Sequence, residues 1–251
     1  MANYWHIIFF SLIGGVFSLI GGLLLLSRKK TAELLAAYAT PFAAGALLAA
    51  VFLDLLHEGV EKADPNTVLS AALIGVILFF LFERYLRWFH HHHQHENSDP
   101  TVNLIVVGDT LHNALDGVAI AAAFLVSVPT GIVTTIAVAA HEIPQEIGDF
   151  GLLLSKGMSR SRVLLANIAS ALATTIFAIV TFAIGSEQGL PLGWLIGLSA
   201  GFLLYIATSD IIPEIHEKTK EKKLFDLQPL LLVLGVVVVT ISIRLAHAFI
   251  E

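Results

Sequence analysis

The chain contains no cysteine and few charged residues. Without cysteine, its 251 residues can form neither disulfide bonds nor thiolate metal sites. Only 14% of the residues are charged, against about 25% in typical soluble domains. The 14 basic residues do not outnumber the 20 acidic ones, so composition gives no support for nucleic-acid binding. Any metal site must therefore be built from imidazole, carboxylate and amide groups.

Long apolar stretches make up most of the sequence, which is 56% hydrophobic. A transmembrane helix needs about 20 mostly apolar residues, and eight stretches meet this need. The sequence therefore predicts an all-α, polytopic membrane protein in which residues 1–251 form a single transmembrane domain. The predicted spans are Tyr4–Leu26, Leu34–Leu56, Val68–Phe89, Thr101–Leu125, Thr130–Leu154, Val163–Ile184, Leu190–Ile211 and Pro229–Ala248.

The basic residues predict the orientation of these spans. All except Lys62 and Arg244 lie at the end of span three or in the connections after spans one, five and seven. These connections share one side of the membrane, and a Lys/Arg excess marks the cytoplasmic side. Both termini are then expected outside the cytoplasm. No organellar signal is visible, so we expect a bacterial-type inner membrane.

A histidine-rich tract lies in the predicted cytoplasmic connection between spans three and four, at about residues 90–99. One interpretation is a solvated low-complexity segment, and the other is a weak metal-binding loop. Its histidines are His90, His91, His92, His93 and His95.

A short acidic pattern occurs twice, at the ends of spans two and seven. Asp54 and Glu58 form one copy, and Asp210 and Glu214 form the other. By the predicted topology, the copies lie at opposite faces of the membrane. Inverted repeats in transporters place matching elements in this way. The alternative is that both are ordinary acidic helix ends.

Two polar clusters interrupt spans four and five near their midpoints. Ionisable groups at membrane depth cost roughly 2.5–3.5 kcal/mol each and are usually functional. Residues four apart share a helix face, and the short link between the two spans predicts antiparallel neighbours. The clusters can therefore face each other. Their candidate ligands are His112, Asn113 and Asp116 on span four, and His141, Glu142, Gln145 and Glu146 on span five.

Mixed nitrogen and oxygen donors are the ligands expected for zinc, iron or manganese. The alternative is a buried hydrogen-bond network that only packs two helices together. A proton-driven carrier of another solute could also use these carboxylates as a relay. An intramembrane zinc protease would need two histidines at i and i+4, and Gln145 stands at the second position. We therefore do not expect an enzyme.

The two clusters resemble those of the ZIP (Zrt-, Irt-like) family of divalent metal transporters. The matching residues are His112-Asn113-x-x-Asp116-Gly117 and His141-Glu142-x-Pro144-x-Glu146. The resemblance implies an eight-helix bundle in which spans one to three and six to eight are inverted repeats around spans four and five. It also implies a homodimer.

In that family a binuclear metal centre lies between spans four and five. The resemblance assigns His112, Asp116, His141 and Gln145 to one site, and Asn113, Asp116 and Glu142 to the second. Glu146 is carried over as a further polar group on the path. Residues expected along the outer and inner parts of the pathway are Asp54, His57 and Glu58, and Asp210, Glu214 and His216.

Two positions depart from the family pattern. Where the family usually has Glu or His, this chain has the neutral Gln145, whose amide oxygen is a weaker ligand. Span six lacks the glutamate that some members place there. The resulting expectation is transport of Zn²⁺ toward the cytoplasm, with Fe²⁺, Mn²⁺ and Cd²⁺ as further substrates. The cation is the cargo, and no cofactor is expected.

Overall fold

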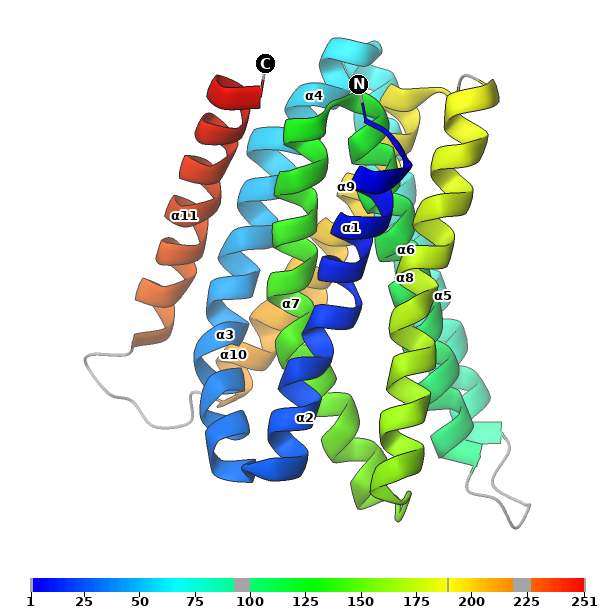
Figure 1. The fold of residues 1–251 in the computed structure, drawn as a ribbon, viewed down its shortest axis with the longest axis vertical. Helices are drawn as coiled ribbons and strands as arrows, with labels where there is room; N and C mark the ends of the chain where they lie inside the picture. Colours follow the sequence, from blue (N-terminus) through cyan, green and yellow to red (C-terminus); the bar gives the residue numbers. More distant parts are fainter. Residues whose placement is uncertain (1, 93–99, 189, 219–226, 251) are drawn as a thin grey trace.

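A computed structural model describes residues 2–92, 100–188, 190–218 and 227–250, and these residues form a helical bundle without strands (Figure 1). Several spans are built from consecutive helical segments. In chain order the elements are α1 (Tyr4–Gly14), η1 (Val16–Ser18), α2 (Leu19–Ser27), α3 (Lys29–Ala50), η2 (Val51–Leu55), α4 (Leu56–Lys62), α5 (Pro65–His92), α6 (Pro100–Val126), α7 (Val128–Ser155), α8 (Arg160–Gln188), α9 (Leu192–Tyr205), η3 (Ile206–Ile211), α10 (Ile212–Lys218) and α11 (Leu227–Ile250).

The all-α membrane fold predicted from the sequence is confirmed, but the count of eight spans is not. Six helices are long and apolar enough to cross a membrane among the residues described. The other two long helices, α6 and α7, contain 27 and 28 residues. They exceed the length that a span requires, but they carry the two polar clusters, which lower their hydropathy. Both run the height of the bundle beside the other helices (Figure 1).

The bundle has one end rich in basic residues, which we call the basic end. The α2–α3 and α7–α8 connections, the end of α5 and the start of α6 lie at this end, at the bottom of Figure 1, and both termini lie at the opposite end. Arg28 lies in the α2–α3 connection and Lys156 in the α7–α8 connection, and Lys29 and Arg160 begin the helices that follow. The helices thus alternate in direction as the charge pattern predicts. That the basic end faces the cytoplasm stays a prediction.

Asp54 and Asp210, one from each copy of the acidic pattern, occupy matching local structures. Asp54 lies in the π-helical segment η2 and Asp210 in the π-helical segment η3. The α3–η2–α4 segment runs away from the basic end, and α9–η3–α10 runs toward it (Figure 1). Single π-helical turns occur frequently at functional sites. This pairing supports the expected inverted repeat.

Two close helix contacts, each at a glycine, also agree with the expected inverted repeat. A Cβ atom on Gly45 of α3 would lie 1.9 Å from the Leu232 carbonyl oxygen of α11. One on Gly201 of α9 would lie 2.1 Å from the Ala72 carbonyl oxygen of α5. Small residues allow such backbone approach between membrane helices. An inverted repeat of spans one to three and six to eight makes the α3–α11 and α9–α5 pairs equivalent.

We expect Gly45→Ala to lower the stability of the purified protein by about 1–3 kcal/mol, because overpacking a tight contact forces the backbones apart. Thermal unfolding in detergent measures this change. Gly151→Ala is the matched control, since its added Cβ would meet only Leu25 Cδ2, at 3.7 Å. Equal unfolding midpoints for the two variants would show that the α3–α11 approach is not a constraint.

Candidate metal site

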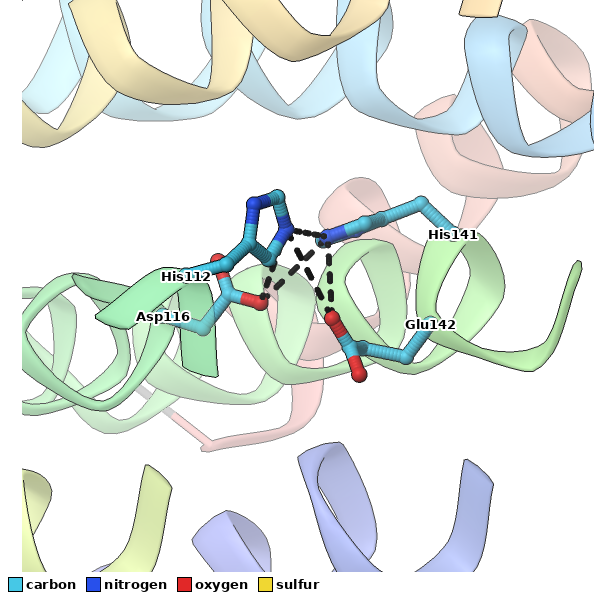
Figure 2. A group of neighbouring side chains, drawn as sticks. All are labelled: His112, Asp116, His141 and Glu142. Carbon is cyan, nitrogen blue, oxygen red and sulfur yellow. Dashed lines mark hydrogen bonds and ion pairs between the residues drawn. The ribbon is translucent and has the colours of Figure 1, made fainter. Parts of the chain in front are cut away.

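Two antiparallel helices supply the polar cluster at the centre of the bundle. α7 follows α6 after one intervening residue, Ser127, whose hydroxyl accepts a hydrogen bond from the Thr130 amide at 3.2 Å and caps the new helix. The chain therefore turns back sharply. His112 and Asp116 lie one helical turn apart on α6, and His141 and Glu142 are adjacent on α7. Figure 2 shows the four side chains converging on one point.

The four potential donor atoms lie close enough to bind one ion. His112 Nε2 lies 3.3 Å from His141 Nε2 and 3.6 Å from Glu142 Oε1. His141 Nε2 lies 3.3 Å from Asp116 Oδ2 and 3.6 Å from Glu142 Oε1. All four atoms lie within 4.8 Å of one another. Tetrahedral zinc with bonds of about 2.0–2.2 Å places its ligands roughly 3.3–3.6 Å apart, so small side-chain shifts are enough for coordination.

The surroundings of the four side chains also suit a cation. Asp116, His141 and Glu142 are each at least 98% buried. Neither oxygen of Glu142 accepts a hydrogen bond from the described residues. His141 Nδ1 lies 3.2 Å from the Ala137 carbonyl oxygen, which leaves Nε2 facing the cluster. Metal-binding histidines are usually oriented in this way. Two carboxylates also balance the charge of a divalent ion.

Asn113 faces away from this group of four, toward α8. Its Oδ1 accepts a hydrogen bond from Thr174 Oγ1 at 2.8 Å, and its Nδ2 donates to Asp109 Oδ1 at 2.9 Å and to Ser170 Oγ at 3.3 Å. The side chain is fully buried. Metal binding through Asn113 Oδ1 would compete with the bond from Thr174. The expected ligand role of Asn113 therefore stays a prediction.

A cavity of about 370 Å³ reaches the cluster from the basic end. His112, His141 and Gln145 line it, so Gln145 lies beside the four donors but outside their group. Gly108 and Asp109 also line it, and both precede His112 on α6, which starts at the basic end. On the other side of the cluster, Ile120, Ala137 and Val138 are fully buried. The cluster is therefore reached from the basic end and covered on the opposite side.

Sequence comparison identifies the family of this chain. The family described as ZIP Zinc transporter matches residues 96–242, more than half of the chain, including all of α6 and α7. This chain belongs to the ZIP family. The resemblance seen in the two polar clusters is thereby confirmed. ZIP proteins are transporters, which also confirms the expectation that the chain is not an enzyme.

Curated ZIP relatives are similar over about half of the chain. Zinc transporter ZIP10 of Danio rerio is 38% identical over 121 residues, which are 48% of this chain and 14% of the relative. Zinc transporter ZIP4 of Mus musculus is 44% identical over 111 residues, 44% of this chain and 16% of the relative. Zinc transporter foi of Drosophila melanogaster is 37% identical over 145 residues, 58% of this chain and 20% of the relative. The matched part is thus a small fraction of each relative, and all three are animal proteins.

The residues expected along the pathway of this ZIP chain do not lie together in one place. Asp210 lines the cavity at the basic end. His57 and Glu58 line a different hollow of about 490 Å³ between α4 and α11, together with Arg244. Asp54 is 99% buried and lines neither space. His216 is exposed on α10, and the side chain of Glu214 lies outside the described part.

The histidine tract cannot be assigned a place at this ZIP site. His90, His91 and His92 end α5, with side chains outside the description, and His93 and His95 lie outside the described residues. Three acidic cavity residues were not predicted as site residues: Glu83, Asp109 and Asp149. Asp109 and Asp149 could have been found, because Asp109 lies one turn before His112 and Asp149 two turns after His141. Glu83 gave no such signal.

Proposed function

We propose that this chain transports divalent metal cations, with Zn²⁺ as the main substrate, through the cluster between α6 and α7. The observation that carries the proposal is the convergence of His112, Asp116, His141 and Glu142 within 4.8 Å at the centre of the bundle. Two imidazoles and two carboxylates replace the hydration shell of a borderline-soft divalent ion. The names of the curated relatives, which are zinc transporters, agree with this substrate.

We further propose that transport runs toward the cytoplasm. The charge pattern assigns the basic end to that side, and the cavity connects this end with the cluster. Asp109, Asp149 and Asp210 line the cavity, and no Lys or Arg lies among its described lining residues. An acidic passage favours release of a cation along it. The membrane type and a homodimer remain expectations based on the sequence and the family.

Uptake by purified protein in liposomes tests the function, using a panel of divalent ions. We expect Zn²⁺ uptake by the wild type, with weaker uptake of Fe²⁺, Mn²⁺ or Cd²⁺. In Gln145→Glu, a carboxylate beside the four donors adds a stronger ligand, so half-saturation should fall to lower Zn²⁺ concentrations. Gln145→Asn, which keeps the amide, is the matched control. Proton movement without uptake of any metal would contradict the proposal and favour the proton-relay alternative.

A further inference from the structure

Glu146 is a buried acid that the four-residue cluster does not use. It lies one turn beyond Glu142 on α7 and is 99% buried. Neither of its carboxylate oxygens accepts a hydrogen bond from the described residues. Buried polar groups without partners are uncommon, and an ionised acid at membrane depth requires compensation. The side chain therefore lacks a partner among the described residues, and a cation is a suitable one.

Asp109 of α6 is a second acid near Glu146. Asp109 is 91% buried, and the hydrogen bond from Asn113 Nδ2 to its Oδ1 fixes the carboxylate. Two carboxylates at one depth, with no Lys or Arg among the described residues that line the cavity, favour a divalent cation between them. Asp109 also lines the cavity, which gives an ion access from the basic end.

Asn167 of α8 contributes a third oxygen at the same level of the bundle. Asn167 is 99% buried. Its Nδ2 donates a hydrogen bond to the Val163 carbonyl oxygen at 2.7 Å. Its Oδ1 has no hydrogen-bond partner among the described residues. Asn113 contacts Ser170 and Thr174 on α8. Because α6 and α8 run in the same direction (Figure 1), Asn167 is level with Asp109.

The antiparallel helix α7 brings Glu146 to this level as well. His141 lies beside His112, and each further residue on α7 moves about 1.5 Å toward the basic end. Glu146 therefore stands roughly one turn closer to the basic end than the four-residue cluster, as Asp109 does on α6. Three helices thus present buried oxygens at one depth.

We propose that Asp109, Glu146 and Asn167 form a second cation site, separate from the four-residue cluster. It would bind a divalent cation through oxygen donors alone. Such donors select hard ions such as Mn²⁺, Mg²⁺ and Ca²⁺, whereas the imidazole-containing cluster suits Zn²⁺. In this site Asn113 has a positioning role, because its hydrogen bond holds the Asp109 carboxylate in place.

Binding of Mn²⁺ to the purified protein, measured from the electron paramagnetic resonance signal of free Mn²⁺, tests the site. The double variant His112→Ala/His141→Ala removes both imidazoles of the cluster, and we expect it to retain one bound Mn²⁺ per chain. Adding Glu146→Gln should weaken this binding at least tenfold. Asn167→Ala in the same background should weaken it several-fold without changing the charge, which provides a second variant if Glu146→Gln fails to fold.

Glu61→Gln in the same background is the matched control. Glu61 is an exposed glutamate on α4, with a side chain that is 57% exposed, and its change should leave Mn²⁺ binding unaltered. Absence of bound Mn²⁺ in the folded double variant would overturn the proposal. Unchanged Mn²⁺ affinity in the folded Glu146→Gln variant would also overturn the proposal. If that variant does not fold, unchanged Mn²⁺ affinity in Asn167→Ala would overturn it. Because the assay measures binding without transport, its failure is distinguishable from a failure of metal uptake.

Discussion

Zn²⁺ uptake should fall at least about a hundredfold in Asp116→Ala and in His141→Ala. Changes to groups that only orient a metal ligand already reduce affinity or activity by about 10–100-fold, and these two residues supply donor atoms directly. Asp116 Oδ2 and His141 Nε2 lie 3.3 Å apart at the centre of the cluster. Removing either side chain leaves three of the four convergent donors. The other side chain of the pair then stays buried without its neighbour.

Uptake into liposomes containing equal amounts of folded protein is the measurement. Thr134→Ala is the control, because Thr134 is a fully buried polar residue on α7 with a hydroxyl that has no hydrogen-bond partner among the described residues. Its uptake should match that of the wild type. Wild-type uptake in both Asp116→Ala and His141→Ala would mean that the ion does not pass through this cluster.

The second large effect concerns access to the cluster from one side. The chain has no cysteine, so Gly108→Cys introduces the only thiol. Gly108 lines the cavity about one turn from His112. A positively charged, membrane-impermeant methanethiosulfonate applied at the basic end should react there. The added charge beside the cluster should reduce Zn²⁺ uptake to less than about a tenth, by repulsion of the cation.

Val138→Cys is the matched test of the covered side. Val138 lies one turn from His141 in the opposite direction and is fully buried. Thiol reactivity depends on exposure, so Val138→Cys should react at least about ten times more slowly than Gly108→Cys. Equal reaction rates from the basic end would show that the cluster is not covered in the way that the structure describes.

The pairing of α6 and α7 could be predicted from the sequence for clear physical reasons. His112 and Asp116 share a helix face because they are four residues apart, and a short connection forces α7 to return beside α6. Polar side chains inside the membrane then restrict which faces of the two helices can pack together. The four-residue cluster is the direct result of these local rules, and the family motifs point to the same residues.

Asn113 illustrates what the sequence could not predict. Its neighbours on α8, Ser170 and Thr174, are far away in sequence, and only the packed bundle brings them to its amide. The one-sided cavity likewise depends on how α3, α5, α7 and η3 assemble around α6. The π-helical segments that contain Asp54 and Asp210 were also not predicted, because no helix-period pattern distinguishes them from an α-helix.

Anomalous diffraction at the zinc absorption edge, from crystals grown with Zn²⁺, tests the central claim most directly. We predict a strong peak about 2.0–2.2 Å from Nε2 of both His112 and His141 and from oxygens of Asp116 and Glu142. Zinc found only at other positions in such crystals, with these four side chains uncoordinated, would contradict the account.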